Sequence, residues 1–219
     1  MQLQLVLDFL KKLKKNNSKE WFDANRPAYE KAKNEVKELV GEVLAKVAVF
    51  DPSIASLEVK DCMFRINRDV RFAKDKSPYK TNMAFMIAPR GKKSIKSCYY
   101  FHIEPGNCFV AGGIYMPLPE HLKLLRQEVD YSGDELKKLF ASKEFKKYFT
   151  GFEEEAKLVR MPQGYTEDHV YSEWLKLKSF TVTSPFDDVL LSNKDIVKQI
   201  TDPFMQLYKL NQFLNKALD

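Results

Sequence analysis

The first quarter of the chain has the spacing of apolar residues that is typical of helices. Four leucines recur at intervals of three or four residues and predict a helix over residues 2–15. Asn17 stands three residues before Glu20, which predicts that Asn17 caps a short second helix. Pro27 suits the first turn of a third helix, whose apolar stripe continues to about Val49. The sequence therefore predicts three consecutive helices in this region.

The middle of the chain instead alternates apolar and polar residues, as strands do. Residues 80–89 and 97–104 are predicted strands joined by a turn at 90–93, and Pro105-Gly106-Asn107 turns the chain into a third strand at 108–116. Antiparallel strands joined by such short turns form a meander.

The position of the second turn predicts how the second and third strands pair. If Glu104 opposes Asn107, the side chains of the two strands separate into an apolar face and a more polar face. The predicted apolar pairs are Ile103 with Cys108, Phe101 with Val110, and Tyr99 with Gly112. The opposite face carries Tyr100, His102 and Glu104.

Helical spacing returns after Pro117 and Pro119 and again over residues 193–218, and residues 179–183 form a further strand candidate. The sequence contains no repeat and no low-complexity linker. We therefore predict one α+β domain over residues 1–219, an antiparallel β-meander packed with amino- and carboxy-terminal helices.

Two glycines, Gly112-Gly113, lie within the third predicted strand, where glycine costs stability. Such a pair indicates a bulge, the close approach of a ligand, or space required by Tyr99 and a neighbouring aromatic side chain.

Charge changes the picture at residues 65–80, RINRDVRFAKDKSPYK. Six cations and two acids give this stretch a net charge of +4, out of +6 for the whole chain. The cations are Arg65, Arg68, Arg71, Lys74, Lys76 and Lys80, and the acids are Asp69 and Asp75. The charge excess is therefore local, and it is compatible with a phosphate-bearing or nucleic-acid partner without requiring one.

The same stretch has the alternation of a strand. In that interpretation Phe64, Ile66, Val70 and Phe72 share a buried face, and Arg65, Asn67, Asp69 and Arg71 share the opposite face. The next residues, from Lys74 to Lys80, are then predicted to be a turn or loop.

Three hypotheses account for this concentration of charge. The first is a pocket for a phosphate-bearing ligand, a nucleotide or a nucleic-acid backbone, because arginine binds phosphate through two parallel hydrogen bonds. Its cations would be Arg68, Arg71, Lys74, Lys76 and Lys80, oriented by Asp69 and Asp75, with the Tyr79 hydroxyl donating to the ligand. The second is a non-enzymatic nucleic-acid or protein interaction module. The third is a purely structural network of ion pairs.

Residues 65–81 resemble the pattern R-x-x-R-D-x-R-F-x-K-D-K-x-P-Y-K-T of an uncharacterised bacterial family, domain of unknown function 2461. Further stretches are similar to the same family, so the resemblance covers about residues 5–185. It implies that one recurring motif contains Arg65, Arg68, Asp69, Arg71, Lys74, Asp75, Lys76, Tyr79 and Lys80. The resemblance implies no activity, so it singles out these residues as a ligand-binding candidate without assigning a reaction.

Catalytic chemistry has few candidates in this sequence. His102 and His169 are the possible general acids or bases, because an imidazole titrates near neutral pH. The histidine spacings do not indicate a metal site, and we expect no metal and no cofactor. No motif of a nucleophilic serine or cysteine is present. Whether the protein is an enzyme therefore stays open.

The three cysteines do not indicate a disulfide framework, since the predicted register places Cys98 opposite Gly113 and not opposite Cys108. The chain opens with an amphipathic helical pattern rather than a signal peptide, and its apolar runs are too short to cross a bilayer. We therefore expect a cytoplasmic protein without a membrane partner.

Overall fold

A four-stranded antiparallel sheet forms the centre of the molecule, and the computed structural model describes all residues 1–219. The strand order β1-β2-β3-β4 follows the chain. The strands are β1 (Met83–Ile87), β2 (Cys98–Ile103), β3 (Cys108–Ile114) and β4 (Phe180–Phe186). Strands β2 and β3 pair so that Tyr99 lies opposite Gly112 and Phe101 lies opposite Val110. This pairing confirms the predicted register.

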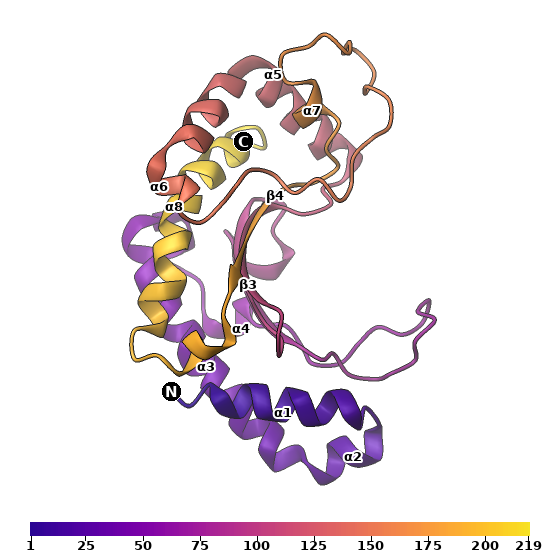
Figure 1. The fold of residues 1–219 in the computed structure, drawn as a ribbon, viewed down its shortest axis with the longest axis vertical. Coiled ribbons are helices and arrows are strands. Elements are labelled where there is room, and N and C mark those ends of the chain that lie inside the picture. The colour runs from indigo at the N-terminus through magenta and orange to yellow at the C-terminus, as the bar shows by residue number, and fades with distance from the viewer.

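Helices cover one face of this sheet, which confirms the α+β prediction (Figure 1). The long helices are α1 (Gln4–Lys15), α3 (Arg26–Phe50), α5 (Pro119–Ala141) and α8 (Ile196–Lys216). The short helices are α2 (Lys19–Ala24), α4 (Val59–Cys62), α6 (Lys143–Lys146) and α7 (Ser172–Leu175). No helix is both long enough and apolar enough to span a membrane.

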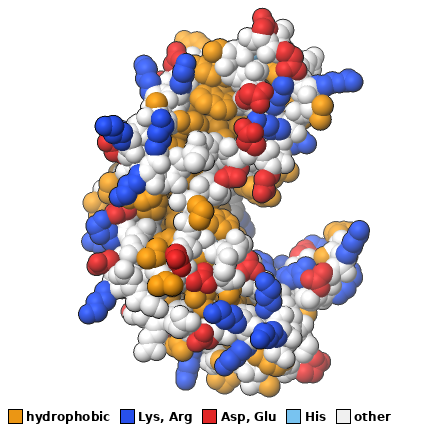
Figure 2. Space-filling view, viewed as in Figure 1, with side chains coloured by type: hydrophobic (Ala, Val, Ile, Leu, Met, Phe, Trp, Pro, Cys, Tyr) orange, Lys and Arg blue, Asp and Glu red, His pale blue; other side chains and the backbone are white.

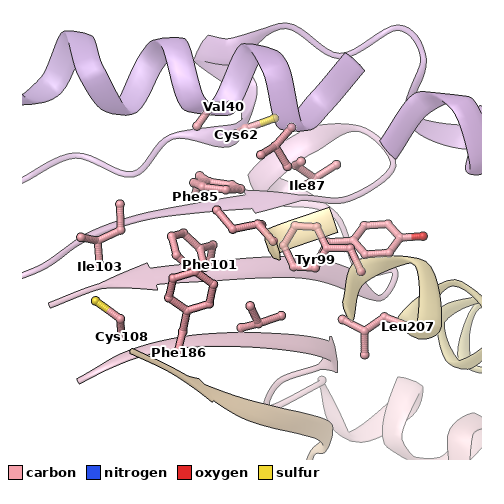
Figure 3. Close-up of a cluster of buried hydrophobic side chains, with 14 of the residues drawn as sticks. Val40, Cys62, Phe85, Ile87, Tyr99, Phe101, Ile103, Cys108, Phe186 and Leu207 are labelled. Carbon is pink, nitrogen blue, oxygen red and sulfur yellow. The ribbon is translucent and has the colours of Figure 1, made fainter. Parts of the chain in front are cut away.

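The hydrophobic core lies between the sheet and the helices α3 and α8, and one cluster contains 46 buried apolar residues. Figure 3 shows part of it, with Phe101 against Phe186 and Tyr99 near Leu207 of α8. The rings of Phe101 and Phe186 meet edge to face at 5.1 Å. These residues alternate along their strands, so their burial on one face follows from the period of two.

The glycine pair explains how α8 approaches β3. A Cβ atom on Gly112 would lie 2.5 Å from Leu207 Cδ1, so the glycine makes room for α8. Gly113 has a φ of +104°, and a Cβ there would lie 2.0 Å from the carbonyl oxygen of Phe180. Close packing and a special backbone conformation therefore account for the pair, and the side chain given room is the aliphatic Leu207 rather than an aromatic one.

The predicted cap of the second helix is wrong by one residue. Ser18, not Asn17, caps α2, and its hydroxyl accepts a hydrogen bond from the Trp21 amide at 3.2 Å. Asn17 is thereby free to bind the backbone of Tyr79 twice. Its amide nitrogen donates to the Tyr79 carbonyl at 2.9 Å, and its oxygen accepts from the Tyr79 N–H at 3.1 Å. Asn17 thus attaches the basic stretch to the start of α2.

The basic stretch is not the predicted strand. Met63 and Phe64 pair with the outer edge of β1, but residues 67–79, which we call the arm, leave the sheet and project from the body (Figure 1). Ile66 is buried as predicted, whereas Phe72 is 96 % exposed. The alternation of apolar residues continues into the arm, but no neighbouring strand is available there to bury them.

The sheet has a second face, which carries no packed helix and which we call the outer face. It bears Tyr100 and His102 on β2, between Ala84 and Met86 of β1 and Phe109 and Ala111 of β3. In Figure 1 this face is turned toward the opening of a C-shaped molecule, opposite α8. Figure 2 shows Lys and Arg side chains gathered along the lower edge of that opening.

Candidate functional site

A pocket of about 340 Å³ lies where α3 and α4 meet the edge of the sheet and the base of the arm. Five of its twelve lining residues are cations, and none is an acid. The cations are Lys33, Lys37, Lys60, Arg65 and Lys80. Half of the lining residues are apolar, and the polar Asn82 completes the wall. The pocket is therefore strongly basic, with partly apolar sides.

Separate elements bring these five cations together. Lys33 and Lys37 lie one turn apart on α3, so they project from the same side of that helix. Lys60 belongs to α4. Arg65 and Lys80 stand at the two ends of the basic stretch, where the Lys80 amide donates to the Ile66 carbonyl at 2.8 Å. That hydrogen bond closes the base of the arm and places both ends beside α3.

The pocket holds more positive charge than its neighbours neutralise. Lys33 pairs with Glu30 at 3.2 Å, and Lys60 pairs with Glu58 at 2.7 Å. Lys37, Arg65 and Lys80 form no ion pair. The Nζ atom of Lys80 lies 5.4 Å from the centre of the Phe64 ring.

Burial lowers the pKa of Lys80, and the positive charge of Arg65 lowers it further. A bound anion would raise this pKa again, because its charge would favour the protonated form of Lys80.

The two arginines inside the arm each form an ion pair there. Arg68 contacts Asp75 at 2.5 Å, and Arg71 binds Asp69 through two nitrogens at 2.7 and 3.0 Å. Lys76 donates to the carbonyl of Val70 at 3.0 Å. Hydrogen bonds from Ser77, and then the contact with Arg68, hold the pKa of Asp75 far below its usual value.

The motif is thus divided between two locations. Arg65 and Lys80 line the pocket, whereas Arg68, Asp69, Arg71, Lys74, Asp75 and Lys76 belong to the arm. Inside the arm, the pairing of acids and cations matches the structural-network hypothesis. The Arg71–Asp69 pair and Asp75 are exposed to solvent, and Arg68 is only partly buried, so these pairs organise the arm locally and add little to global stability.

Tyr79 attaches the carboxy-terminal end of the arm to the body. Its side chain is only 6 % exposed, and its ring stacks on Phe22 of α2 with centres 3.9 Å apart and planes 14° apart. Asn17 holds its backbone on both sides. The geometry therefore explains Tyr79 as an aromatic anchor.

Of the two histidine candidates, the structure places His102 beside the basic stretch. Its Nδ1 lies 2.9 Å from the Tyr100 hydroxyl, and its Nε2 lies 3.5 Å from Glu104 Oε2. Glu104 in turn accepts a hydrogen bond from the Thr81 hydroxyl at 2.9 Å, directly after Lys80. His169 lies instead beside α5, where its Nε2 contacts Asp130 at 2.9 Å.

No three side chains of the types that bind metals are arranged to hold a metal ion. Sequence reasoning did not find Lys33, Lys37 and Lys60. Lysines one turn apart on the polar face of an amphipathic helix are the ordinary pattern of a solvated surface, so the sequence carries no signal that distinguishes them.

A family model described as "Conserved hypothetical protein (DUF2461)" matches residues 5–213. The chain belongs to this family. The DUF2461 match extends beyond the motif resemblance, through β4 and nearly to the end of α8, so it includes the helix that closes the core. No curated protein and no solved structure matches the sequence. Membership of DUF2461 assigns no reaction to the chain.

Proposed function

We propose that this DUF2461 protein binds a phosphate-bearing ligand in the pocket between α3, α4 and the base of the arm. The observation that carries the proposal is the lining itself, which holds five cations and no acid. Lysine and arginine are the side chains that bind phosphate oxygens, and a partly desolvated site strengthens those contacts. The unpaired charges of Arg65 and Lys80 are the centre of the proposed site.

The shape and walls of the pocket favour a nucleotide among phosphate-bearing ligands. Tyr29 and Phe64 provide aromatic surface for a base, and Asn82 offers both a donor and an acceptor. Pockets of about 300–1,000 Å³ are typical of small-molecule sites, which is the range of this one.

A double substitution tests the proposal. Wild-type protein is expected to show a higher melting temperature in the presence of at least one compound from a low-salt panel of nucleotides, sugar phosphates, polyphosphate, and short DNA and RNA. At a hundredfold excess over Kd the gain is about 2.7 kcal/mol, which corresponds to about 5–10 °C. In Arg65→Ala/Lys80→Ala we expect affinity to fall about 100-fold or more, because two charge-assisted contacts are lost.

Arg71→Ala/Lys74→Ala is the matched control, because it removes one arginine and one lysine from outside the pocket. It is expected to retain the thermal shift. Equal loss of binding in both double variants would refute the pocket and would indicate a response to net charge alone.

The exposed end of the arm favours a second candidate function, a non-enzymatic nucleic-acid interaction module. Phe72 is 96 % exposed, and the guanidinium of Arg71 lies 6.0 Å from the centre of its ring. Exposed aromatics beside cations stack on bases in proteins that bind single strands.

If this second function holds, Phe72→Ala is expected to weaken binding to a short single-stranded oligonucleotide by about 10-fold, since stacking contributes about 1–3 kcal/mol per base. Affinity is also expected to fall steeply as salt increases. Fluorescence anisotropy across a salt series measures both effects. Unchanged affinity in Phe72→Ala would remove the arm tip from any nucleic-acid contact.

A further inference from the structure

Three polar side chains stand in a row that anion binding does not use, Tyr100 and His102 on the outer face of β2 and Glu104 directly after the end of that strand. Tyr100, His102 and Glu104 stand at every second position, so all three project from the same face. The Tyr100 hydroxyl lies 2.9 Å from His102 Nδ1, and His102 Nε2 lies 3.5 Å from Glu104 Oε2. This order of a hydroxyl, an imidazole and a carboxylate is the arrangement by which proteins activate a nucleophile.

The surroundings fix the protonation of the imidazole. The carboxylate of Glu104 next to Nε2 favours the tautomer with its proton on Nε2, which leaves Nδ1 as the acceptor for the Tyr100 hydroxyl. Burial lowers the pKa of His102, against the opposing effect of Glu104, so the neutral form of the ring is favoured at pH 7. The ring also stacks on Phe109 at 4.6 Å, which holds its plane in place.

Glu104 remains a carboxylate in this environment. Burial alone would raise the pKa of Glu104, but hydrogen bonds from Asn107 and Thr81, together with His102, hold it below the usual value. Burial, and then the nearby Cys98 and Glu104, raise the pKa of Tyr100 to about 12. At rest the phenol therefore keeps its proton, and it needs a base to react.

The Tyr100 ring is also next to the proposed anion pocket. It lies 6.2 Å from the Phe64 ring, and Phe64 lies under Lys80 at 5.4 Å. The neighbouring outer-face residues of β1 and β3 are Ala84, Met86, Phe109 and Ala111. None of these four titrates, so Cys98, Glu104 and, through Phe64, Lys80 are the titratable groups near the pair.

We propose that Tyr100 is an activated nucleophile, that His102 is its general base, and that Glu104 is the positioning residue that sets the tautomer of His102. In the reaction the Tyr100 oxygen attacks the phosphorus of a bound phosphate ester. The bond between Tyr100 Oη and phosphorus forms as the bond from phosphorus to the leaving oxygen breaks. The phenol proton passes to His102 Nδ1 and from there to the leaving oxygen. The substrate class rests on the proposed function, whereas the activation of Tyr100 does not.

Benzenesulfonyl fluoride tests the activation without any knowledge of the substrate. Tyr100 Oη forms a bond to sulfur, fluoride leaves, and His102 takes the proton. Peptide mass spectrometry measures the labelling rate at each tyrosine. We expect Tyr100 to be labelled at least 10-fold faster than Tyr115 and Tyr131, which are 79 % and 90 % exposed. The expected rate is constant from pH 7 to 8, since His102 is already neutral there, whereas an unassisted phenol reacts about 10-fold faster per pH unit.

His102→Gln is expected to reduce labelling of Tyr100 at least 10-fold and to leave Tyr115 and Tyr131 unchanged. Glu104→Gln keeps the size of the side chain. It is expected to reduce the labelling rate of Tyr100 about fivefold, with a melting temperature close to that of wild type. Slower labelling of Tyr100 than of Tyr131 in wild type, or an unchanged rate in a folded His102→Gln or Glu104→Gln variant, would overturn the activation.

Protection of Tyr100 by inorganic pyrophosphate tests whether the activated tyrosine and the anion pocket form one site. Pyrophosphate is expected to slow labelling of Tyr100 in wild type but not in Arg65→Ala/Lys80→Ala. If Tyr100 is activated and pyrophosphate gives no protection, the phosphoryl substrate is refuted while the activation stands. Anion binding itself is decided by the thermal shifts, which do not depend on Tyr100.

Discussion

Gly113→Ala is expected to lower the free energy of unfolding by at least about 3 kcal/mol, which corresponds to a fall in melting temperature of about 6–12 °C. The added Cβ would lie 2.0 Å from the carbonyl oxygen of Phe180, an overlap that only a backbone shift can relieve. That shift would disturb the pairing of Gly113 with Thr181 between β3 and β4. The φ of +104° adds strain for any residue with a side chain. Urea denaturation followed by circular dichroism measures the loss.

Gly106→Ala is the control, since it separates backbone conformation from steric overlap. Gly106 also has a positive φ, +76°, but no atom lies within 4 Å of its Cβ position. The expected cost is about 1–2 kcal/mol, the cost of a left-handed conformation. Equal losses in the two variants would show that overlap with Phe180 contributes nothing.

Tyr79→Ala is expected to cost about 3–5 kcal/mol, as for other large aromatic side chains removed from a core. The substitution removes a buried ring stacked on Phe22 and thereby loosens the end of the arm that places Lys80. Loss of ligand binding is expected to accompany the loss of stability. Thermal denaturation with and without ligand measures both effects on one sample.

Tyr79→Phe distinguishes the anchor from a ligand-binding hydroxyl. It keeps the ring and its stacking, so we expect stability within about 0.5 kcal/mol of wild type and unchanged ligand affinity. Reduced affinity at unchanged stability would instead support the sequence-based hypothesis that the Tyr79 hydroxyl donates to the ligand.

The central hairpin was predictable because its signals are local. Pro105-Gly106-Asn107 fixes where the chain turns, and the period of two then sets every pair between β2 and β3. The same reasoning placed His102 and Glu104 on one face, which is where the structure has them. Local signals also located two helices: leucine spacing predicted α1, and Pro27 marked the first turn of α3.

The arm and the pocket were not predictable, because both depend on contacts between distant segments. Phe64 and Phe72 look alike in the alternating pattern, yet only the segment around Phe64 finds a partner strand in β1. The motif cations look alike as well. The hydrogen bond between Lys80 and Ile66 closes the base of the arm, so only Arg65 and Lys80, at the two ends of the motif, line the pocket. No local pattern indicates that α3 and α4 supply the remaining lysines.

The place of α8 in the chain has a consequence for synthesis on the ribosome. This helix covers the inner side of β2 and β3 and packs along α3, yet it is translated after all of them. Until residues 196–216 emerge, the side of the sheet that carries Tyr99, Phe101 and Val110 has no cover from α8. Nascent chains that expose apolar strands in this way are prone to aggregate and are substrates for chaperones. The nascent protein is therefore expected to depend on chaperones until its last long helix has docked.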